Sequence, residues 1–194
     1  MERVNLMVGR FQPFTLGHLK CVETAWRENG YPTIICMISN TKFDTRHPFS
    51  DELIEEEMKD ICKGNKMVHS IRRVTNGNIA GIVHFINMDN IEVQAIVTGT
   101  DRVEDYEKIV DRARKNPNQD RNPFIDSFHV IEVKRGDEDV SATKVRQTIK
   151  DDNLSEFKKL MPSSAVKLFD KFKEQLNSVK ESFISLTNYI VDKL

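Results

Sequence analysis

Short apolar runs alternate with segments of helical spacing along this chain, and that alternation constrains the fold more than any other feature. Val4–Val8 and Thr33–Ser39 are predicted to be buried strands, because they are almost continuously apolar. The segment His18–Asn29 between them is predicted to be a helix that stops at Gly30. Strands that alternate with helices are typical of an open parallel sheet with helices on both faces. The predicted fold class is therefore α/β.

The same alternation continues through the middle of the chain. Later strands are predicted at Val68–Val74, Val93–Thr98 and Ser127–Val133, and later helices at Ser50–Lys63 and Arg102–Lys115. The pattern of Asn78–Phe85 is ambiguous, and a helix is the favoured interpretation. Right-handed crossovers place the loops after Val8, Thr98 and Val133 at one rim of the sheet. Because ligands of open α/β sheets bind at that rim, these loops are the first candidates for a site.

The charge balance indicates what kind of partner to expect. Lys and Arg number 29 against 30 Asp and Glu, for a net charge of −1, so no nucleic acid or membrane surface is expected as a partner. No apolar run reaches the length of about 18 residues that indicates a transmembrane helix, and no signal-peptide core precedes the first strand. Cys21, Cys36 and Cys62 form no C-x-x-C pair and are predicted to be buried, reduced thiols. We therefore expect a cytoplasmic protein with a local site for any anion.

The segment G-R-F-Q-P-F-T-L-G-H, residues 9–18, has the features of a phosphate-binding loop. Gly9 follows a buried strand and lets the backbone turn and approach a ligand closely, and Gly17 relieves crowding before the next helix. The first-turn N–H groups of that helix attract an anion. Thr15 adds a hydroxyl, His18 a ring N–H, and Arg10 a fixed cation. The alternative is a structural role for His18, which this combination of groups makes the weaker interpretation.

A second anion site is predicted at S-A-T-K-V-R, residues 141–146. Ser141 is a suitable N-cap, and Thr143 lies in the first turn of the helix that follows. Arg146 is one turn further on, so its side chain can reach back to the N-terminal end, where Lys144 is a second cation. Taken alone, the segment fits an ordinary capped surface helix. Beside the first motif, convergence on one anionic group is the stronger interpretation.

The end of the chain has a different pattern. Apolar residues recur there at steps of three and four, at Leu168, Phe172, Leu176, Val179, Phe183, Leu186, Ile190 and Leu194. Such a stripe predicts one or two amphipathic helices, separated from the preceding helix by Pro162. The stripe either packs on the parent domain or forms an interface between copies of the chain. We predict an α/β domain at residues 1–162 and a C-terminal helical extension at residues 163–194.

The two motifs give the chain its resemblance to a known group of enzymes. It resembles the nucleotidylyltransferase superfamily, whose signatures are T/H-x-G-H and I-S-S-T-x-x-R, and within it most of all the archaeal-type nicotinamide mononucleotide adenylyltransferases. Those proteins carry G-R-F-Q-P-x-H-x-G-H, then N-P-F-T-A-G-E-R, then I-S-S-T-x-x-R. This chain has Gly9–His18, H-P-F-S-D-E-L at His47–Leu53, and V-S-A-T-K-V-R at Val140–Arg146, in the same order. The resemblance covers residues 1–162.

The resemblance implies a Rossmann-like fold and transfer of AMP from ATP to a phosphate-bearing acceptor, with release of pyrophosphate. Nicotinamide mononucleotide, giving NAD, is the favoured acceptor. Mg²⁺ is expected to bridge the ATP phosphates without a protein-ligated site. The residues implied in catalysis are His18, Arg146, Thr15 and Arg10. The residues implied in nucleotide binding are Gly9, Arg10, Phe11, Thr15, Gly17, His18, Gly99, Asp101, Ser141, Thr143 and Arg146.

The implied roles divide the triphosphate among these groups. Thr15 and His18 would contact the triphosphate, with His18 near the α-phosphate, and Arg146 would hold the departing β- and γ-phosphates with Ser141 and Thr143. Arg10 would be a further clamp. In relatives the region Gly99–Val103 holds the nucleoside, so Asp101 would bind a ribose hydroxyl or the acceptor, or alternatively cap the next helix. For the nicotinamide ring, Phe43, Phe49 and Phe85 are unranked candidates, because the helical position of Trp26 predicts a core residue.

Three positions depart from the pattern of the adenylyltransferases, and they define the alternatives. Thr15 replaces a His, Ala142 replaces the second Ser, and the segment His47–Leu53 lacks the Gly-Glu-Arg ending. One alternative is a related enzyme with another acceptor, such as phosphopantetheine, or one that uses CTP and a phospho-alcohol. Another is a non-catalytic nucleotide sensor that binds a partner through its C-terminal stripe.

Overall fold

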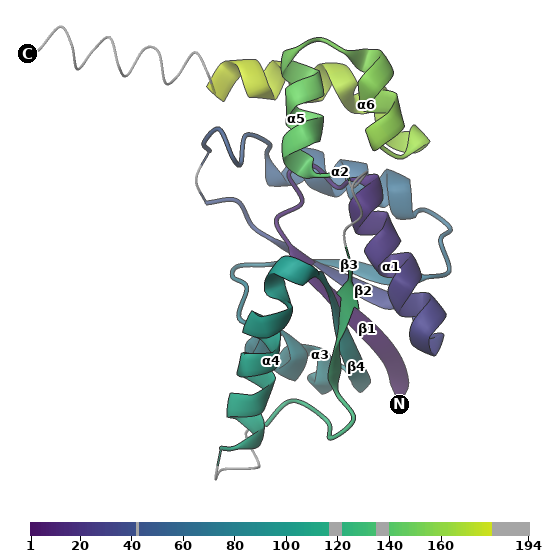
Figure 1. Cartoon of the computed structure of the whole chain (residues 1–194), viewed down its shortest axis with the longest axis vertical. Helices are drawn as coiled ribbons and strands as arrows, with labels where there is room; N and C mark the ends of the chain where they lie inside the picture. The colour runs from purple at the N-terminus through teal and green to yellow at the C-terminus, as the bar shows by residue number, and fades with distance from the viewer. Residues whose placement is uncertain (42, 117–121, 135–139, 180–194) are drawn as a thin grey trace, which may run out of the picture. The chain divides into compact units, whose positions relative to one another are not determined.

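The computed structural model describes residues 1–41, 43–116, 122–134 and 140–179. The chain forms two compact units, coloured along the sequence in Figure 1. We call them the sheet unit and the helical unit. The sheet unit comprises Met1–Gly9, Gly17–Ser39 and Gly64–Asp139, and the helical unit comprises Arg10–Leu16, Asn40–Lys63 and Val140–Leu194.

The sheet unit is built on five parallel strands in the order β3-β2-β1-β4-β5. The strands are β1 (Glu2–Gly9), β2 (Thr33–Ile38), β3 (Val68–Val74), β4 (Ile91–Gly99) and β5 (His129–Val133). Central β2 is buried continuously from Thr33 to Met37, as expected of a parallel strand covered on both faces. The predicted α/β fold class, a Rossmann-like open parallel sheet, is confirmed.

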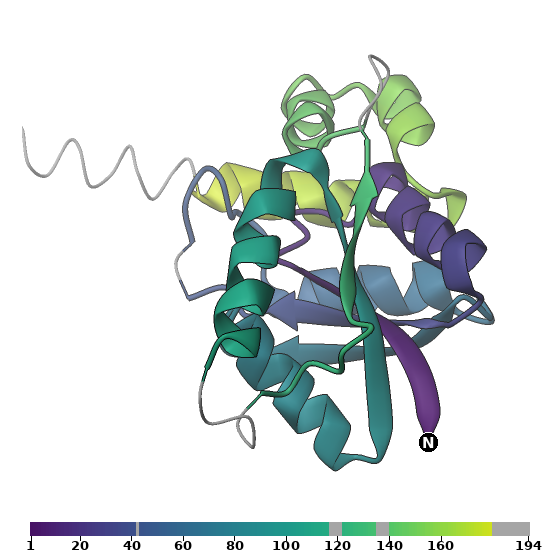
Figure 2. The ribbon, with the colours of Figure 1, turned by 60° about the horizontal axis from the view of Figure 1, so that its bottom comes forward.

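Three helices connect these strands: α1 (Leu16–Asn29), α3 (Ile79–Met88) and α4 (Thr100–Arg114). Side chains of α3 and α4 form one apolar cluster with Val4, Leu6, Ile34 and Cys36 of the central strands. Since parallel crossovers are right-handed, α1 covers the opposite face of the sheet. Figure 2 shows α4 (teal) beside the edge strand β5 (green). The N-cap of α3 is Asn78, whose side chain accepts the N–H of Gly81, so the helix predicted from Asn78 is confirmed.

Helical spacing predicted that Leu19, Val22 and Trp26 form the buried face of α1, and of these three only Val22 is buried. Cys21, Val22 and Ala25 are buried, whereas Leu19 and Trp26 are only half-buried. Lys66 lies over the ring of Trp26, with its Nζ 5.8 Å from the ring centroid. The spacing of the large residues therefore did not predict the buried face of α1 correctly. Smaller side chains form that face, because they allow the helix to approach the sheet closely.

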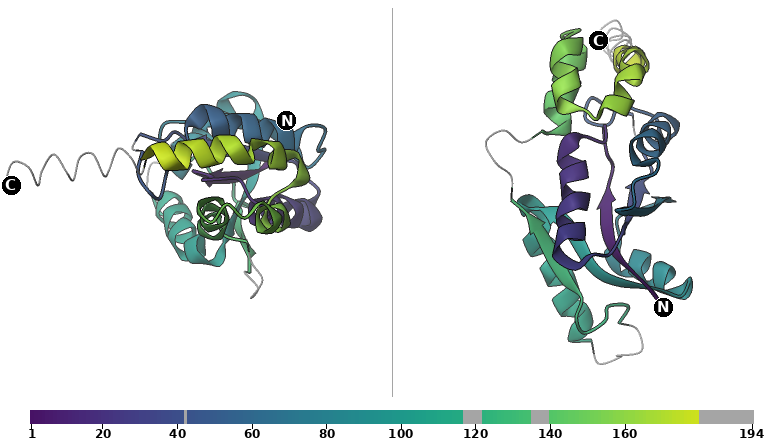
Figure 3. Two further views of the ribbon diagram at one scale, coloured as in Figure 1. Left: turned by 90° about the horizontal axis from the view of Figure 1, so that it is seen from above. Right: turned by 90° about the vertical axis from the view of Figure 1, so that its right-hand side faces the viewer.

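The helical unit contains α2 (Asp51–Cys62), α5 (Ala142–Lys150), α6 (Leu154–Leu160), the 3₁₀ helix η2 (Ser163–Leu168) and a helix over residues 169–179. Its core is aromatic: the ring of Phe172 lies 4.7 Å from that of Phe49, and the rings of Phe157 and Phe169 are 4.9 Å apart. Both views of Figure 3 show the helix at residues 169–179 (yellow) beside α2 (blue).

The apolar stripe of the C-terminal segment is buried within this unit as far as it is described. Leu168, Phe172, Leu176 and Val179 are all buried. Around them, Lys171 pairs with Glu56 at 2.7 Å and Lys167 with Asp60 at 2.9 Å, both on α2. The stripe residues Phe183, Leu186, Ile190 and Leu194 lie outside the described residues. Their role as an interface between copies, and the division of the chain after residue 162, stay predictions.

The three cysteines are buried free thiols, as predicted. Burial raises the pKa of Cys36 to about 11, and it does the same for Cys62, with the nearby Glu57 adding to the effect. Over the part of the chain that the structure describes, no helix is long and apolar enough to cross a bilayer.

Candidate functional site

The carboxyl edge of the sheet carries two glycines side by side at its centre. Gly9 ends β1 and pairs in register with Met37 of β2, while Gly99 ends β4 and pairs with Val133 of β5. The strands β1 and β4 are neighbours in the sheet and pair as far as Leu6 and Ile96, so the two glycines end adjacent parallel strands. Both glycines are half-buried, and because neither has a Cβ, a ligand can approach the backbone closely where β1 and β4 end.

Two helix N-termini follow these strands in the sequence. The helix α1 begins at Leu16, two residues earlier than predicted, so that both Gly17 and His18 lie in its first turn. The helix α4 has Gly99 as its N-cap and Asp101 in its first turn. Asp101 is therefore not the N-cap that the alternative interpretation proposed. First-turn N–H groups have no partner within their helix, and they favour anions.

The loop Arg10–Leu16 is held in an unusual backbone conformation within the helical unit. Phe11 has φ at 51°, in the left-handed region that bulky side chains rarely adopt, and its ring packs 5.3 Å from that of Phe14. Phe11, Phe14 and Thr15 are buried, whereas Arg10 is exposed. Such strain persists only where the surroundings over-determine it, and it is concentrated at functional loops.

Gln12 ties this loop to the start of α2. Its side-chain Nε2 donates to the carbonyl of Phe49 at 3.1 Å, and its Oε1 accepts the N–H of Phe49 at 2.9 Å. The amide thus forms a closed pair with one backbone residue, and its burial strengthens both bonds relative to water. A side chain satisfied in this way fixes the register between the loop and the segment that precedes α2.

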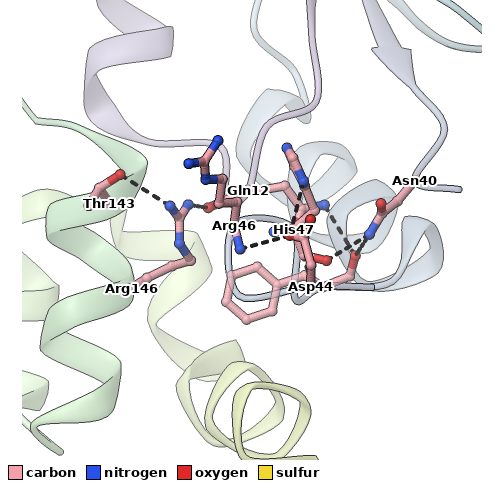
Figure 4. Close-up of polar contacts among 8 residues, drawn as sticks. Gln12, Asn40, Asp44, Arg46, His47, Thr143 and Arg146 are labelled. Carbon is pink, nitrogen blue, oxygen red and sulfur yellow. Dashed lines mark hydrogen bonds and ion pairs between the residues drawn. The ribbon is translucent and has the colours of Figure 1, made fainter. Parts of the chain in front are cut away.

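Arg146 of α5 joins the second motif to the first (Figure 4). Its Nη1 donates to the backbone carbonyl of Gln12 at 2.6 Å, and its Nη2 donates to Thr143 Oγ1 at 3.1 Å. Burial lowers the pKa of Arg146, and the negative charge of Asp44 opposes that shift. The guanidinium still carries its charge at any physiological pH. Arg146 is therefore a half-buried, oriented cation beside the loop Arg10–Leu16.

The start of α5 is formed as predicted. Ser141 is the N-cap, and its Oγ accepts the N–H of Lys144 at 3.1 Å. Ala142 and Thr143 follow in the first turn, with Thr143 exposed. Val145, Thr148 and Ile149 form the buried face of this helix, whereas Thr143 and Lys144 are exposed and Arg146 is half-buried.

A tight turn at residues 44–47 contributes the acidic group near Arg146. Asp44 Oδ1 accepts the N–H groups of Arg46 and His47, at 2.8 and 2.7 Å, and lies 3.2 Å from the His47 ring (Figure 4). Some loss of hydration raises the pKa of Asp44, but these N–H groups and His47 bring it below its usual value. Asn40 closes the segment by donating to the carbonyls of His47 and Phe49.

Glu57 approaches the same loop from the buried face of α2. Its Oε2 accepts the N–H of Phe14 at 3.0 Å, while its Oε1 is a buried oxygen without a hydrogen-bond partner among the described residues. Burial raises the pKa of Glu57 well above its ordinary value, and the Phe14 N–H opposes the shift only in part.

The structure brings together some of the predicted site residues and leaves others apart. Within the helical unit Arg146 and Thr143 are joined to the loop that contains Arg10, Phe11 and Thr15. His18, Gly99 and Asp101 belong to the sheet unit, and their meeting with Arg146 at one nucleotide stays a prediction. Among the three aromatic candidates, Phe49 is buried in the core of the helical unit, whereas Phe43 and Phe85 are exposed.

Sequence reasoning missed two side chains that hold the loop, Gln12 and Glu57. A signal for Glu57 was present, because it stands four residues after Leu53 and three after Ile54, on the apolar face of α2. An acid at such a position predicts a buried, paired group. Gln12 stands in the G-R-F-Q-P segment, but the sequence does not show its partners, which are backbone atoms of a segment distant in sequence. Within the described ranges, no group of three or more His, Cys, Asp and Glu residues could hold a metal ion.

Solved structures share this fold. The bifunctional nicotinamide mononucleotide adenylyltransferase/ADP ribose pyrophosphatase of Francisella tularensis, complexed with AMP and a manganese ion, matches with a TM-score of 0.64 and 20% identity over 99% of this chain. The chain spans 54% of the length of that enzyme. The nicotinic acid mononucleotide adenylyltransferase of Plasmodium falciparum matches with a TM-score of 0.62 and 11% identity, over 90% of this chain and 98% of its own.

A third structure shows the breadth of the fold. TmcAL of Thermotoga maritima, bound with alpha-thio ATP, matches with a TM-score of 0.55 and 15% identity, over 88% of this chain and 56% of its own. At these identities the likeness concerns the fold alone. No curated protein sequence matches the chain. The model of the family described as cytidylyltransferase-like matches residues 6–148, a span that includes both motifs, and the chain therefore belongs to the cytidylyltransferase-like family.

Proposed function

We propose that this protein transfers the AMP moiety of ATP to nicotinamide mononucleotide, forming NAD and releasing pyrophosphate. The observation that carries the proposal is the hydrogen bond from Arg146 Nη1 to the carbonyl of Gln12, at 2.6 Å. It joins the two motifs that the resemblance assigns to triphosphate binding, through residues that are 134 positions apart in the sequence. Solved enzymes of the same fold that act on nicotinamide or nicotinic acid mononucleotide support this choice of acceptor.

The chemistry requires positioning more than acid–base catalysis. An oxygen of the acceptor phosphate attacks the α-phosphorus of ATP in line, the bond from that phosphorus to the bridging oxygen breaks, and pyrophosphate leaves. The nucleophile is already ionised at neutral pH, so no protein base is needed. The protein contributes by holding the reactants in line and by neutralising the growing negative charge.

Each proposed group has one task in this scheme. His18 donates to the α-phosphate, and Thr15 donates to the triphosphate. Arg146 holds the departing β- and γ-phosphates. Its bonds to Gln12 and Thr143 orient a guanidinium that has five N–H groups, and they engage two of these among the described residues.

The remaining residues complete the proposed nucleotide site. Ser141 and Thr143 add hydroxyl donors at the start of α5, and Arg10 adds an exposed cation beside the loop. Gly9 and Gly99 allow close approach at the carboxyl edge of the sheet, and Asp101 binds a ribose hydroxyl or the acceptor. Mg²⁺ enters as part of the ATP complex, held by phosphate oxygens and water, because this ion keeps most of its waters.

A related transferase is the second candidate, and two observations favour it. The family model is described as cytidylyltransferase-like, and the segment His47–Leu53 lacks the Gly-Glu-Arg ending of the nicotinamide enzymes. Such an enzyme would use CTP with a phospho-alcohol, or ATP with phosphopantetheine. A non-catalytic nucleotide sensor is the third, supported by Ala142 in place of a serine.

One assay separates these functions. The purified full chain is incubated with ATP, Mg²⁺ and nicotinamide mononucleotide, and pyrophosphate and NAD are measured together. We expect equal amounts of the two products. Pyrophosphate that forms only with CTP, or only with another acceptor from a panel, would move the assignment to the second candidate. If the protein binds ATP but releases no pyrophosphate under any condition, the result would support the non-catalytic nucleotide sensor.

A further inference from the structure

Glu57 is a buried acid that the proposed chemistry does not use. It stands on the apolar face of α2 between Ile54 and Met58, and none of its surface reaches solvent. One carboxyl oxygen accepts the backbone N–H of Phe14 at 3.0 Å. The other oxygen has no hydrogen-bond partner among the residues that the structure describes. Among the described residues, the hydrogen bond of this side chain is therefore made to the loop Arg10–Leu16.

Such a contact is costly to keep in an apolar interior. A buried polar atom without a partner costs about 1–3 kcal/mol, and burial of a carboxylate costs more. A leucine at this position would pack against Ile54 and Met58 without that cost. It would, however, remove the acceptor that the N–H of Phe14 has in Glu57. The hydrogen bond to the loop backbone therefore explains why an acid stands at this position, whereas the packing of α2 does not.

The contact lies between the groups proposed to bind the triphosphate. Phe14 immediately precedes Thr15, and the carbonyl of Gln12, which receives Arg146, is two residues earlier. Residues 10–15 of the loop belong to no helix or strand, and Phe11 adopts a strained positive φ of 51°. Its position accordingly depends on side-chain anchors from outside, and Glu57 is one of them.

We propose that Glu57 is a positioning residue, which fixes the peptide of Phe14 so that Thr15 and the loop backbone are presented to the triphosphate of ATP. The inference rests on the proposed function and adds to it a residue outside both motifs. Glu57 acts through the loop and touches no substrate.

The test compares three substitutions at one position in the full chain. Glu57→Gln keeps an acceptor oxygen for the Phe14 N–H, and Glu57→Leu removes it. Glu57→Asp shortens the side chain by one methylene group, so that its oxygens lie farther from the N–H. The dissociation constant for ATP is measured by calorimetry without acceptor, and kcat and KM for both substrates are measured separately. Glu55→Leu is the matched control, because it makes the same change on α2 at a residue paired with Lys59.

We expect Glu57→Leu to weaken ATP binding about tenfold or more, the usual effect of losing one structural hydrogen bond at a binding loop. The KM for the acceptor should change less than about twofold. Glu57→Gln should bind ATP within about threefold of the wild type, and Glu57→Asp should resemble Glu57→Leu. If Glu57→Leu does not fold, Glu57→Asp carries the same comparison.

Three outcomes would overturn the inference. In the first, a folded Glu57→Leu or Glu57→Asp chain binds ATP as tightly as the wild type. In the second, Glu57→Gln loses as much affinity as Glu57→Leu. In the third, the control loses as much as either. A wild type that binds ATP but transfers no AMP contradicts the proposed function alone, since the affinity comparison stands without turnover. A wild-type chain that binds no ATP would contradict both the proposed function and the inference about Glu57.

Discussion

Arg146 shows how single residues in this protein acquire their orientation. Its guanidinium is half-buried, donates to the carbonyl of Gln12 and to Thr143, and lies within electrostatic reach of Asp44. A lysine could not reproduce this arrangement, because the planar fork holds two fixed directions at once. The role of Arg146 in binding the departing phosphates rests on that orientation.

Replacement of Arg146 tests its assignment. We expect Arg146→Ala to raise the KM for ATP by about tenfold or more, because a charged hydrogen bond contributes about 1.5–3 kcal/mol. The KM for the acceptor should change less than about threefold. Steady-state kinetics with each substrate varied in turn provide the measurement. Lys150→Ala, at the far end of α5, is the control. Equal increases in both KM values would count against the assignment.

His18 carries the prediction about the chemical step itself. We expect His18→Ala to lower turnover at least about 100-fold, a typical loss when one donor to a developing charge is removed. The rate of pyrophosphate release at saturating substrates gives the measurement. His84→Ala is the control, because His84 is an exposed histidine on α3. A folded His18→Ala chain with the wild-type rate would remove His18 from the mechanism.

Glu57 predicts a pH dependence of stability. Burial raises its pKa in the folded chain, so the folded chain keeps a proton that the unfolded chain releases near its ordinary pKa of about 4.3. The contribution of Glu57 to the free energy of unfolding is therefore fully present below that pH. It is lost as the pH rises toward the pKa of Glu57 in the folded chain. The loss is about 1.4 kcal/mol per pH unit.

The Glu57→Gln chain lacks this titration and serves as the reference. We expect its free energy of unfolding, relative to the wild type, to increase as the pH rises above the ordinary pKa of a glutamic acid toward the raised pKa of Glu57 in the folded chain. Urea unfolding at each pH measures the difference, in which contributions from other groups cancel. Parallel curves for the two chains would mean that Glu57 titrates normally.

At the scale of elements, Ser50 at the start of α2 forms hydrogen bonds both within its own helix and with a helix distant in the sequence. Ser50 was predicted as an N-cap, and its Oγ accepts the N–H of Leu53 at 3.3 Å. Its own N–H donates to Gln175 Oε1 at 2.8 Å, and Gln175 Nε2 donates back to Ser50 Oγ at 3.2 Å. The C-terminal helix therefore completes the cap of α2, next to the Phe49 backbone that holds Gln12.

This double cap predicts coupled effects on stability. Ser50→Ala and Gln175→Ala should each lower the free energy of unfolding by about 1 kcal/mol. The double variant should lose less than the sum, by about 0.5 kcal/mol or more, because the two residues share bonds. Asn153→Ala removes the N-cap of α6 and should combine additively with Gln175→Ala. Additivity of Ser50→Ala with Gln175→Ala would show that the cap works without the C-terminal helix.

For the whole molecule, the proposed function predicts that ATP stabilises the folded chain even without an acceptor. A ligand that binds only the folded state at 100 times its dissociation constant adds about 2.7 kcal/mol. We expect the unfolding temperature to rise with ATP concentration in the wild type, and to rise much less in Arg146→Ala at the same concentrations. Thermal unfolding followed by circular dichroism measures both. An unchanged unfolding temperature at millimolar ATP would contradict nucleotide binding.

The sequence by itself determined the local elements and the order of the sheet unit's strands and helices. Apolar runs, caps and glycine stops are signals between near neighbours, so β3 was predicted at its observed bounds, and the N-caps Ser50 and Ser141 were predicted correctly. The motifs were predictable for the same reason, because phosphate binding needs particular residues at short, regular spacings.

Only the tertiary structure decided which distant groups hold the loop Arg10–Leu16. Gln12 bonds the Phe49 backbone, Glu57 bonds the Phe14 backbone, and Gln175 reaches Ser50 across 125 residues. Backbone atoms carry no sequence signature, so the sequence does not reveal which backbone a side chain will bond, even for Gln12, which stands in the first motif. The same reason explains Trp26, which was predicted to be core and is only half-buried, since the approach of α1 to the sheet is set by the packing of Cys21, Val22 and Ala25.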